Sequence, residues 1–208
     1  MRVSKGLYMG SIIGGAILGG ILIVVAVLTP VLMETNSPSF SSLLPALVIG
    51  IAVLIYATVM YLVLLYEAWK VIQDGHARTS PGKAVGFMFI PFFQLYWVFQ
   101  AHWGFAQDYN AYVERHYNVS EGGISVPAVS TSLFLACSIL VMVSGLLPWI
   151  LWIPGIPIGG IIITTNIINI ISLAMFILFI LVINALCNAI NNLPAYPGVT
   201  GREEKSQP

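Results

Sequence analysis

The sequence predicts an all-α membrane protein with four transmembrane helices and one further aromatic segment, which is re-entrant or lies as an amphipathic helix at the interface. Of the 208 residues, 58% are hydrophobic and only 8% are charged, whereas a soluble domain carries about 25% charged residues. Residues 6–33, 35–66, 84–107 and 122–201 contain no charged side chain. Each stretch exceeds the roughly 20 apolar residues that one helical pass needs. A soluble globular monomer is therefore excluded.

The first two predicted helices cover about residues 7–28 and 43–66. The first should end at Thr29, because Pro30 does not continue a helix. The second should extend as a polar turn through Glu67, Lys70 and Asp74, which stand three and four residues apart and can pair along one face.

Small residues recur every fourth position in the first helix. Gly10 and Gly14 form one such pair, and Gly15 and Gly19 form another. Small-x-x-x-small patterns let helix backbones approach closely in lipid. These four glycines are predicted helix-packing residues, and they serve either a homo-oligomer face or a seat for a neighbouring helix of the same chain.

The third charge-free stretch, residues 84–107, is aromatic and interrupted by proline. Residues 99–116 follow a helical period in which polar and apolar side chains separate onto two faces, which indicates an amphipathic helix at the membrane interface. The predicted interfacial segment includes Pro91, Gln94, Trp97, His102, Trp103 and Asp108.

The distribution of lysine and arginine decides between four and five passes. If residues 84–107 do not cross, all eight basic residues lie on the cytoplasmic side; if they cross, three lie outside. The positive-inside rule therefore favours four transmembrane helices, with five as the alternative. Both termini are then cytoplasmic, residues 1–193 form one polytopic membrane domain, and residues 194–208 form a short disordered tail.

The last charge-free stretch divides at a turn over residues 149–157 into helices at about 126–147 and 160–191. The final helix carries amides on one face, within an arc of about 100°. A face of this kind forms hydrogen bonds between helices or lines a polar path. Its members are Asn166, Asn169, Asn184, Asn188 and Asn191.

No catalytic or cofactor motif is visible in the sequence. It holds no P-loop, GxSxG or HExxH pattern, and its three histidines lack metal-ligand spacing. We therefore predict no cofactor and no metal, and an enzyme is less favoured than a binding role. The balanced charge and the lack of a basic stripe argue against a nucleic-acid partner.

Residues 80–91 read Ser-Pro-Gly-Lys-Ala-Val-Gly-Phe-Met-Phe-Ile-Pro. This SPGxAVGxxFIP segment resembles a group of uncharacterised bacterial multi-pass membrane proteins and, more distantly, a domain of unknown function. Gln94 stands where relatives often carry asparagine. The resemblance implies a bacterial cytoplasmic membrane protein and transfers no catalytic residue.

Three function classes follow from these observations. The first, which we favour, is a scaffold or accessory subunit of a membrane complex that packs through its glycine faces and aromatic segment. The second is a small-solute or ion transporter with an asparagine-lined path. The third is a membrane-embedded lipid-binding protein or enzyme that uses His102, His116, Asp108 and Glu114 at the cytoplasmic interface. The predicted partners are the bilayer and a homo-oligomer or larger complex.

Overall fold

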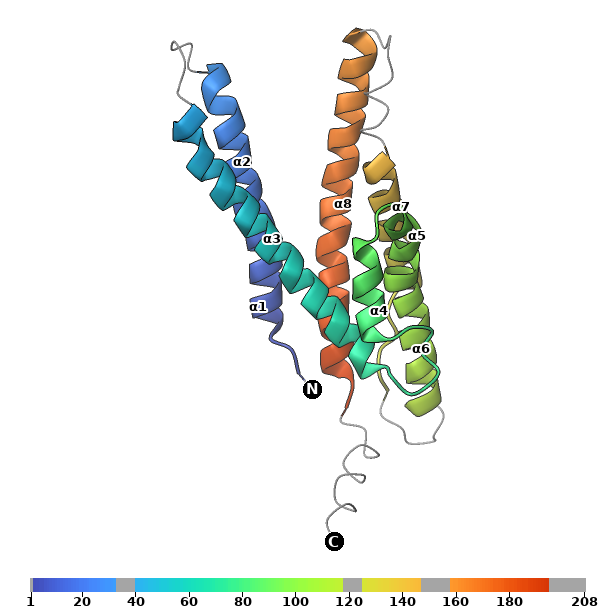
Figure 1. The fold of residues 1–208 in the computed structure, drawn as a ribbon. Coiled ribbons are helices and arrows are strands. Elements are labelled where there is room, and N and C mark those ends of the chain that lie inside the picture. Colours follow the sequence, from blue (N-terminus) through green and yellow to red (C-terminus); the bar gives the residue numbers. More distant parts are fainter. Residues whose placement is uncertain (1, 33–39, 118–124, 147–157, 195–208) are drawn as a thin grey trace. The chain divides into compact units, whose positions relative to one another are not determined.

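All the regular secondary structure in the part that the structure describes is helical (Figure 1). A computed structural model describes residues 2–32, 40–117, 125–146 and 158–194. Three of its helices are long and apolar enough to cross a membrane, and a fourth, over Thr131–Leu146, is apolar but shorter. The three are Lys5–Ala26, Leu44–Val71 and Asn166–Asn192. The predicted all-α class is confirmed for the described residues, while four membrane spans stay a prediction.

The chain forms two compact units, which are described in turn. One comprises Ser4–Leu64, and the other comprises Met1–Val3 together with Leu65–Pro208. The predicted tail falls almost wholly outside the described residues.

The first unit begins with a helical run of three parts. These are α1 (Lys5–Met9), a π-helical turn η1 (Gly10–Gly14) and α2 (Gly15–Leu32). The Ser4 side chain caps the start by accepting a hydrogen bond from the Leu7 backbone N–H. The helix passes through Pro30 to Leu32, so its predicted end at Thr29 is wrong. A proline removes one backbone hydrogen bond, and a membrane helix can tolerate that loss.

Helix α3 (Phe40–Val71) starts slightly before the predicted residue 43 and packs against α2 inside the first unit. A Cβ atom on Gly19 would lie 2.9 Å from the Gly50 carbonyl oxygen, and one on Gly15 would lie 3.0 Å from the Ala57 Cβ. Gly15 and Gly19 are therefore the seat for a neighbouring helix of the same chain. A Cβ on Gly10 or Gly14 would have no such neighbour within 4 Å.

In the second unit, residues 81–116 fold back on themselves as a helical hairpin, which we name the aromatic hairpin. Its first arm consists of α4 (Pro81–Gly86) and the 3-10 turn η2 (Phe87–Phe89). After a tight turn at residues 90–92, its second arm consists of α5 (Phe93–Val98), the π-helical turn η3 (Phe99–Trp103) and α6 (Gly104–His116).

Aromatic rings fill the space between the two arms. The Phe87 ring lies 4.7 Å from the Trp97 ring and 5.7 Å from the Phe93 ring, measured between centroids. The Trp97 indole N–H also donates a hydrogen bond of 3.0 Å to the Ala84 carbonyl. Trp97, a predicted interfacial residue, thus joins the arms.

The second arm has the two faces that the sequence predicts. Its apolar side chains, however, are buried against protein instead of lying on lipid headgroups: the Phe105 ring lies 5.7 Å from Trp69 of α3 and 6.0 Å from Phe134 of α7. Buried residues of this face are Phe105, Ala106, Tyr109, Tyr112 and Val113.

Helix α7 (Thr131–Leu146) runs antiparallel to the second arm. Contacts occur at three levels: Leu95 near Gly145, Phe105 near Phe134, and Asn110 at Val129. Residue numbers rise along one helix as they fall along the other. The two helices therefore lie side by side over their described lengths.

Helix α7 begins five residues later than the predicted residue 126. The Ser130 hydroxyl accepts a hydrogen bond from the Leu133 backbone N–H, which caps the helix there. The Asn110 side chain holds the preceding backbone through both the N–H and the carbonyl of Val129. These bonds fix Val129 outside the helix.

Helix α8 (Ile158–Asn192) extends two residues before and one residue beyond its predicted bounds. It packs beside α7, where the Ser144 hydroxyl contacts the Met175 sulfur at 3.3 Å. Near its end, the Ala189 carbonyl accepts a hydrogen bond of 3.3 Å from the Tyr109 hydroxyl of α6. The aromatic hairpin is thus packed against both C-terminal helices.

Candidate functional site

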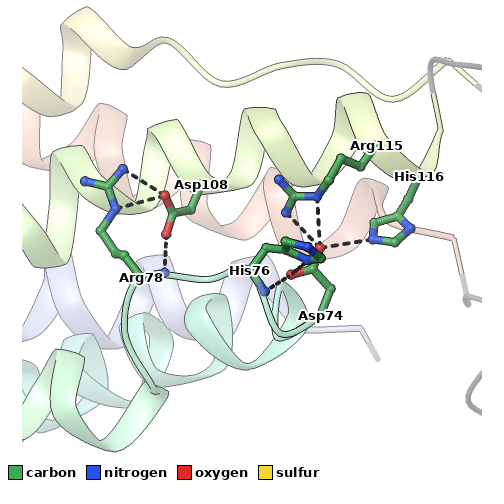
Figure 2. Close-up of polar contacts among 6 residues, drawn as sticks. All are labelled: Asp74, His76, Arg78, Asp108, Arg115 and His116. Atoms are coloured by element: carbon green, nitrogen blue, oxygen red, sulfur yellow. Dashed lines mark hydrogen bonds and ion pairs between the residues drawn. The ribbon is translucent and has the colours of Figure 1, made fainter.

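Charged side chains gather where the two ends of the aromatic hairpin meet (Figure 2). The loop after α3 supplies an aspartate, a histidine and an arginine, and α6 supplies an aspartate, an arginine and a histidine. We name this group the base cluster: Asp74, His76, Arg78, Asp108, Arg115 and His116.

Asp74 accepts hydrogen bonds from several directions. Its Oδ2 lies 2.7 Å from Nη2 of Arg115 and 3.1 Å from Nε2 of His116, and its Oδ1 accepts from the backbone N–H of His76 at 2.9 Å. Burial alone would raise the pKa of this carboxyl group. The hydrogen bonds from His76, Arg115 and His116, with the charge of Arg115, lower the pKa from 3.8 to about 2.

Arg78 binds Asp108 on the other side of the cluster. Its Nε and Nη2 lie 2.9 and 2.8 Å from Oδ1 of Asp108, and Nη2 also donates to the Gln107 side-chain oxygen at 2.8 Å. Gly104 leaves room for this guanidinium, because a Cβ there would lie 3.1 Å from Nη1 of Arg78. Charge and shape thus fix Arg78 on α6.

The other predicted interfacial residues lie apart from the base cluster. Pro91 and Gln94 are exposed at the turn, and Trp103 is half-buried. His102 is buried within the π-helical turn, and its Nδ1 donates a hydrogen bond of 2.9 Å to the Val98 carbonyl. In the same turn, the Trp69 indole N–H donates to the Ala101 carbonyl at 3.0 Å.

The amides of α8 do not form one buried face. Asn166 and Asn169 are exposed, and Asn184 and Asn188 are half-buried. Asn191 binds the N-terminal segment: its Oδ1 accepts from the Val3 N–H at 2.8 Å and its Nδ2 donates to the Val3 carbonyl at 3.0 Å. The environment of these amides changes along the helix.

Sequence reasoning missed the partner of Asp74. The predicted pairing along α3 holds between Glu67 and Lys70, whose charged atoms lie 3.7 Å apart, but Asp74 pairs with α6 instead. Arg115 and His116 at the end of an amphipathic helix gave only a weak signal, because water and the helix dipole stabilise basic side chains there as well as an acidic partner does. The roles of Asn110 and Asn191 left no comparable signal.

The base cluster neutralises charge and closes the hairpin. Arg78 and Arg115 each face a carboxylate, so these ionised groups are occupied by structural pairing. Within the described ranges, no group of three or more histidine, cysteine, aspartate or glutamate side chains is arranged to hold a metal ion. Comparisons with protein-family models, curated proteins and solved structures find no match to this chain.

Proposed function

We propose that this chain is a four-pass membrane protein with a re-entrant aromatic hairpin, and that it serves as a scaffold or accessory subunit of a membrane complex. One observation carries the proposal: the base cluster joins residues 74–78 to residues 108–116. The segment between them starts and ends at the same level, as a re-entrant element does. A simple fifth pass would separate these ends by the bilayer thickness, about 30 Å.

Charge placement supports the orientation. Among described residues 65–194, every charged aspartate, glutamate, lysine and arginine falls within residues 67–83 or 108–115, which flank the hairpin. The Val3–Asn191 contact brings the N-terminal segment to the end of α8, and Tyr117, which follows α6, donates a hydrogen bond to the Pro194 carbonyl there. Basic residues gathered at one end of a bundle favour the cytoplasmic side. This arrangement supports cytoplasmic termini, while the resemblance of residues 80–91 is what suggests a bacterial cytoplasmic membrane.

The engagement of candidate reactive groups supports a scaffold over an enzyme. Asp108 is paired with Arg78, His116 with Asp74, and His102 with the Val98 carbonyl. The hairpin interior is filled by aromatic rings instead of by the polar groups that a transport path would use. A hairpin with a closely packed aromatic interior is suited to act as a rigid element against which other subunits pack.

Accessibility of engineered cysteines tests the topology. In a background with Cys137→Ala and Cys187→Ala, Ser80→Cys and Ser120→Cys are introduced one at a time, and intact cells are treated with a membrane-impermeant thiol reagent. We expect neither cysteine to be labelled until the membrane is opened. Labelling of residue 120 alone in intact cells would establish the five-pass alternative.

The mass of the assembly tests the scaffold role. We expect the protein particle extracted with its lipids into nanodiscs to have more than the mass of one chain. Gly14 has no neighbour within 4 Å of its Cβ position and is therefore open to a second subunit, so Gly14→Leu should reduce the particle to the mass of one chain. Gly20→Leu is the matched control, since Gly20 is equally open on the same helix. A wild-type particle with one chain and no stoichiometric subunit would contradict this role.

A further inference from the structure

The turn of the aromatic hairpin exposes a group of large apolar side chains. The exposed fractions are 69% for Phe89, 45% for Ile90, 82% for Phe92 and 57% for Tyr96. We name these four residues the hairpin tip. Single exposed apolar residues are common, but four within eight residues form a surface whose removal from water is favourable.

Three backbone N–H groups of the turn are paired within it. The N–H groups of Phe93, Gln94 and Leu95 donate to the carbonyls of Pro91, Ile90 and Phe92 at 2.7, 3.0 and 3.1 Å. Proline at position 91 has no N–H to satisfy. An irregular backbone is costly in hydrocarbon because polar groups there find no water. Internal pairing reduces this cost at the tip.

Phe92 occupies a backbone conformation that bulky residues rarely adopt. Its φ is 62° and its ψ is −42°, and the hydrogen bond from the Phe93 N–H to the Pro91 carbonyl spans it as a γ-turn. Such a conformation is strained for a residue other than glycine. With 82% of the residue exposed, little burial within the chain offsets that cost. Contact outside the chain would offset it.

The distance between the tip and the base cluster indicates the occupant of this surface. Asp108 of the base cluster lies sixteen residues from Phe92 along the second arm, which corresponds to about 24 Å at 1.5 Å per residue. A base cluster at headgroup level would place the tip well inside a hydrocarbon core about 30 Å thick. Residues 84–107 carry no aspartate, glutamate, lysine or arginine that would oppose this depth.

We propose that the hairpin tip inserts among lipid acyl chains in the bilayer interior, with Phe92 as its apolar anchor. This inference rests on the re-entrant topology of the proposed function. The exposed Gln94 amide beside the tip is a cost of this placement, because hydrocarbon offers it no hydrogen bond. A protein surface that covered the tip would be expected to bind this amide, so the effect of removing it separates the two occupants.

Spin labels on the full chain in phosphatidylcholine–phosphatidylglycerol bilayers test the proposal. Labels are attached at Phe92→Cys and, as the control, at His76→Cys, whose side chain is 70% exposed in the base cluster; Cys137 and Cys187 are replaced by alanine. At residue 92 we expect frequent collisions with oxygen and loss of collisions with a water-soluble nickel chelate. At residue 76 we expect frequent collisions with the nickel chelate.

Frequent nickel collisions at residue 92 would place the tip in water and overturn the proposal. Rare collisions with both reagents would show that protein covers the tip and would overturn it as well. If Ser120→Cys is labelled from outside, the re-entrant topology itself fails. If Ser120→Cys is protected and residue 92 still meets nickel, only the lipid anchor fails.

A set of variants provides a second measurement that requires no label. We expect Phe92→Gln to lower the thermal unfolding temperature in lipid nanodiscs, because it places a second amide in hydrocarbon. Phe92→Leu, the matched apolar control, and Gln94→Leu should leave that temperature unchanged or raise it. A loss of stability on Gln94→Leu, with Phe92→Gln neutral, would indicate a polar protein contact and contradict the lipid anchor.

Discussion

Arg78 binds Asp108 through its backbone and its side chain at once. The Arg78 N–H donates to Oδ2 of Asp108 at 2.8 Å, while its guanidinium contacts Oδ1 at 2.8 and 2.9 Å. The two residues are 30 positions apart. One carboxylate therefore fixes both the path of the loop after α3 and the position of α6.

Removing either charge should weaken the hairpin base. We expect Asp108→Asn to lower the free energy of unfolding by about 1 kcal/mol, because the asparagine keeps an acceptor but loses the ion pair, which is partly exposed to water. Arg78→Gln should have a similar effect, and the double variant should lose less than the sum of the two. Thermal unfolding in detergent measures this coupling, and strictly additive losses would show that the pair contributes none.

Gly104 should accept no side chain without displacing Arg78. In Gly104→Ala, the new Cβ would lie 3.1 and 3.2 Å from Nη1 and Cδ of Arg78. We expect this variant to unfold at a lower temperature despite the greater helix propensity of alanine. Gly86→Ala is the matched control, since a Cβ there has no neighbour within 4 Å, and it should be neutral or stabilising. Equal behaviour of the two variants would remove the proposed role of Gly104.

The two glycine pairs of the first helix should respond differently to alanine. A Cβ on Gly19 would lie 2.9 Å from a backbone oxygen of Gly50, which cannot rotate away, so Gly19→Ala should destabilise the first unit by about 1–3 kcal/mol. Gly14→Ala meets no such atom and should stabilise the monomeric chain by up to about 1 kcal/mol. Urea or SDS titration of each variant measures the difference, which would vanish if the α2–α3 packing were absent.

Asp74 should make stability fall in acid. Because its pKa is lowered from 3.8 to about 2 in the fold, the unfolded chain binds a proton more readily between these values. Its contribution is present above about pH 4 and is lost as the pH falls toward 2, by about 1 kcal/mol after allowance for solvent screening. Between pH 5 and pH 2, the free energy of unfolding should therefore fall more steeply with decreasing pH for the wild type than for Asp74→Asn. Identical slopes would contradict this role.

Patterns within one helix were predictable, and contacts between distant helices were not. Charge-free length predicted the long apolar helices, and the helical period predicted that Phe105, Tyr109 and Val113 share one apolar face. The period does not state what covers that face, so protein contacts at Trp69 and Phe134 replaced the predicted lipid surface.

The polar contacts of the candidate site were harder to predict. Asp74 and Arg115 are 41 positions apart, and nearer basic residues offered equally good pairing by sequence alone. The start of α7 depended on Asn110, which binds a backbone 19 positions away. Side chains that bind backbone groups carry no periodic signal, because any exposed N–H and carbonyl would suit them equally.

The Val3–Asn191 contact has a consequence for biosynthesis. Both backbone groups of Val3 are satisfied by one side chain that lies 188 positions later. During translation, the hydrogen bonds between Val3 and Asn191 cannot form until nearly the whole of α8 has left the ribosome. The early helices can insert before that moment, but the contact between the N-terminal segment and the end of α8 forms only after α8 has been made. Truncation before residue 191 would remove the side chain that binds both backbone groups of Val3, while the earlier helices could still insert.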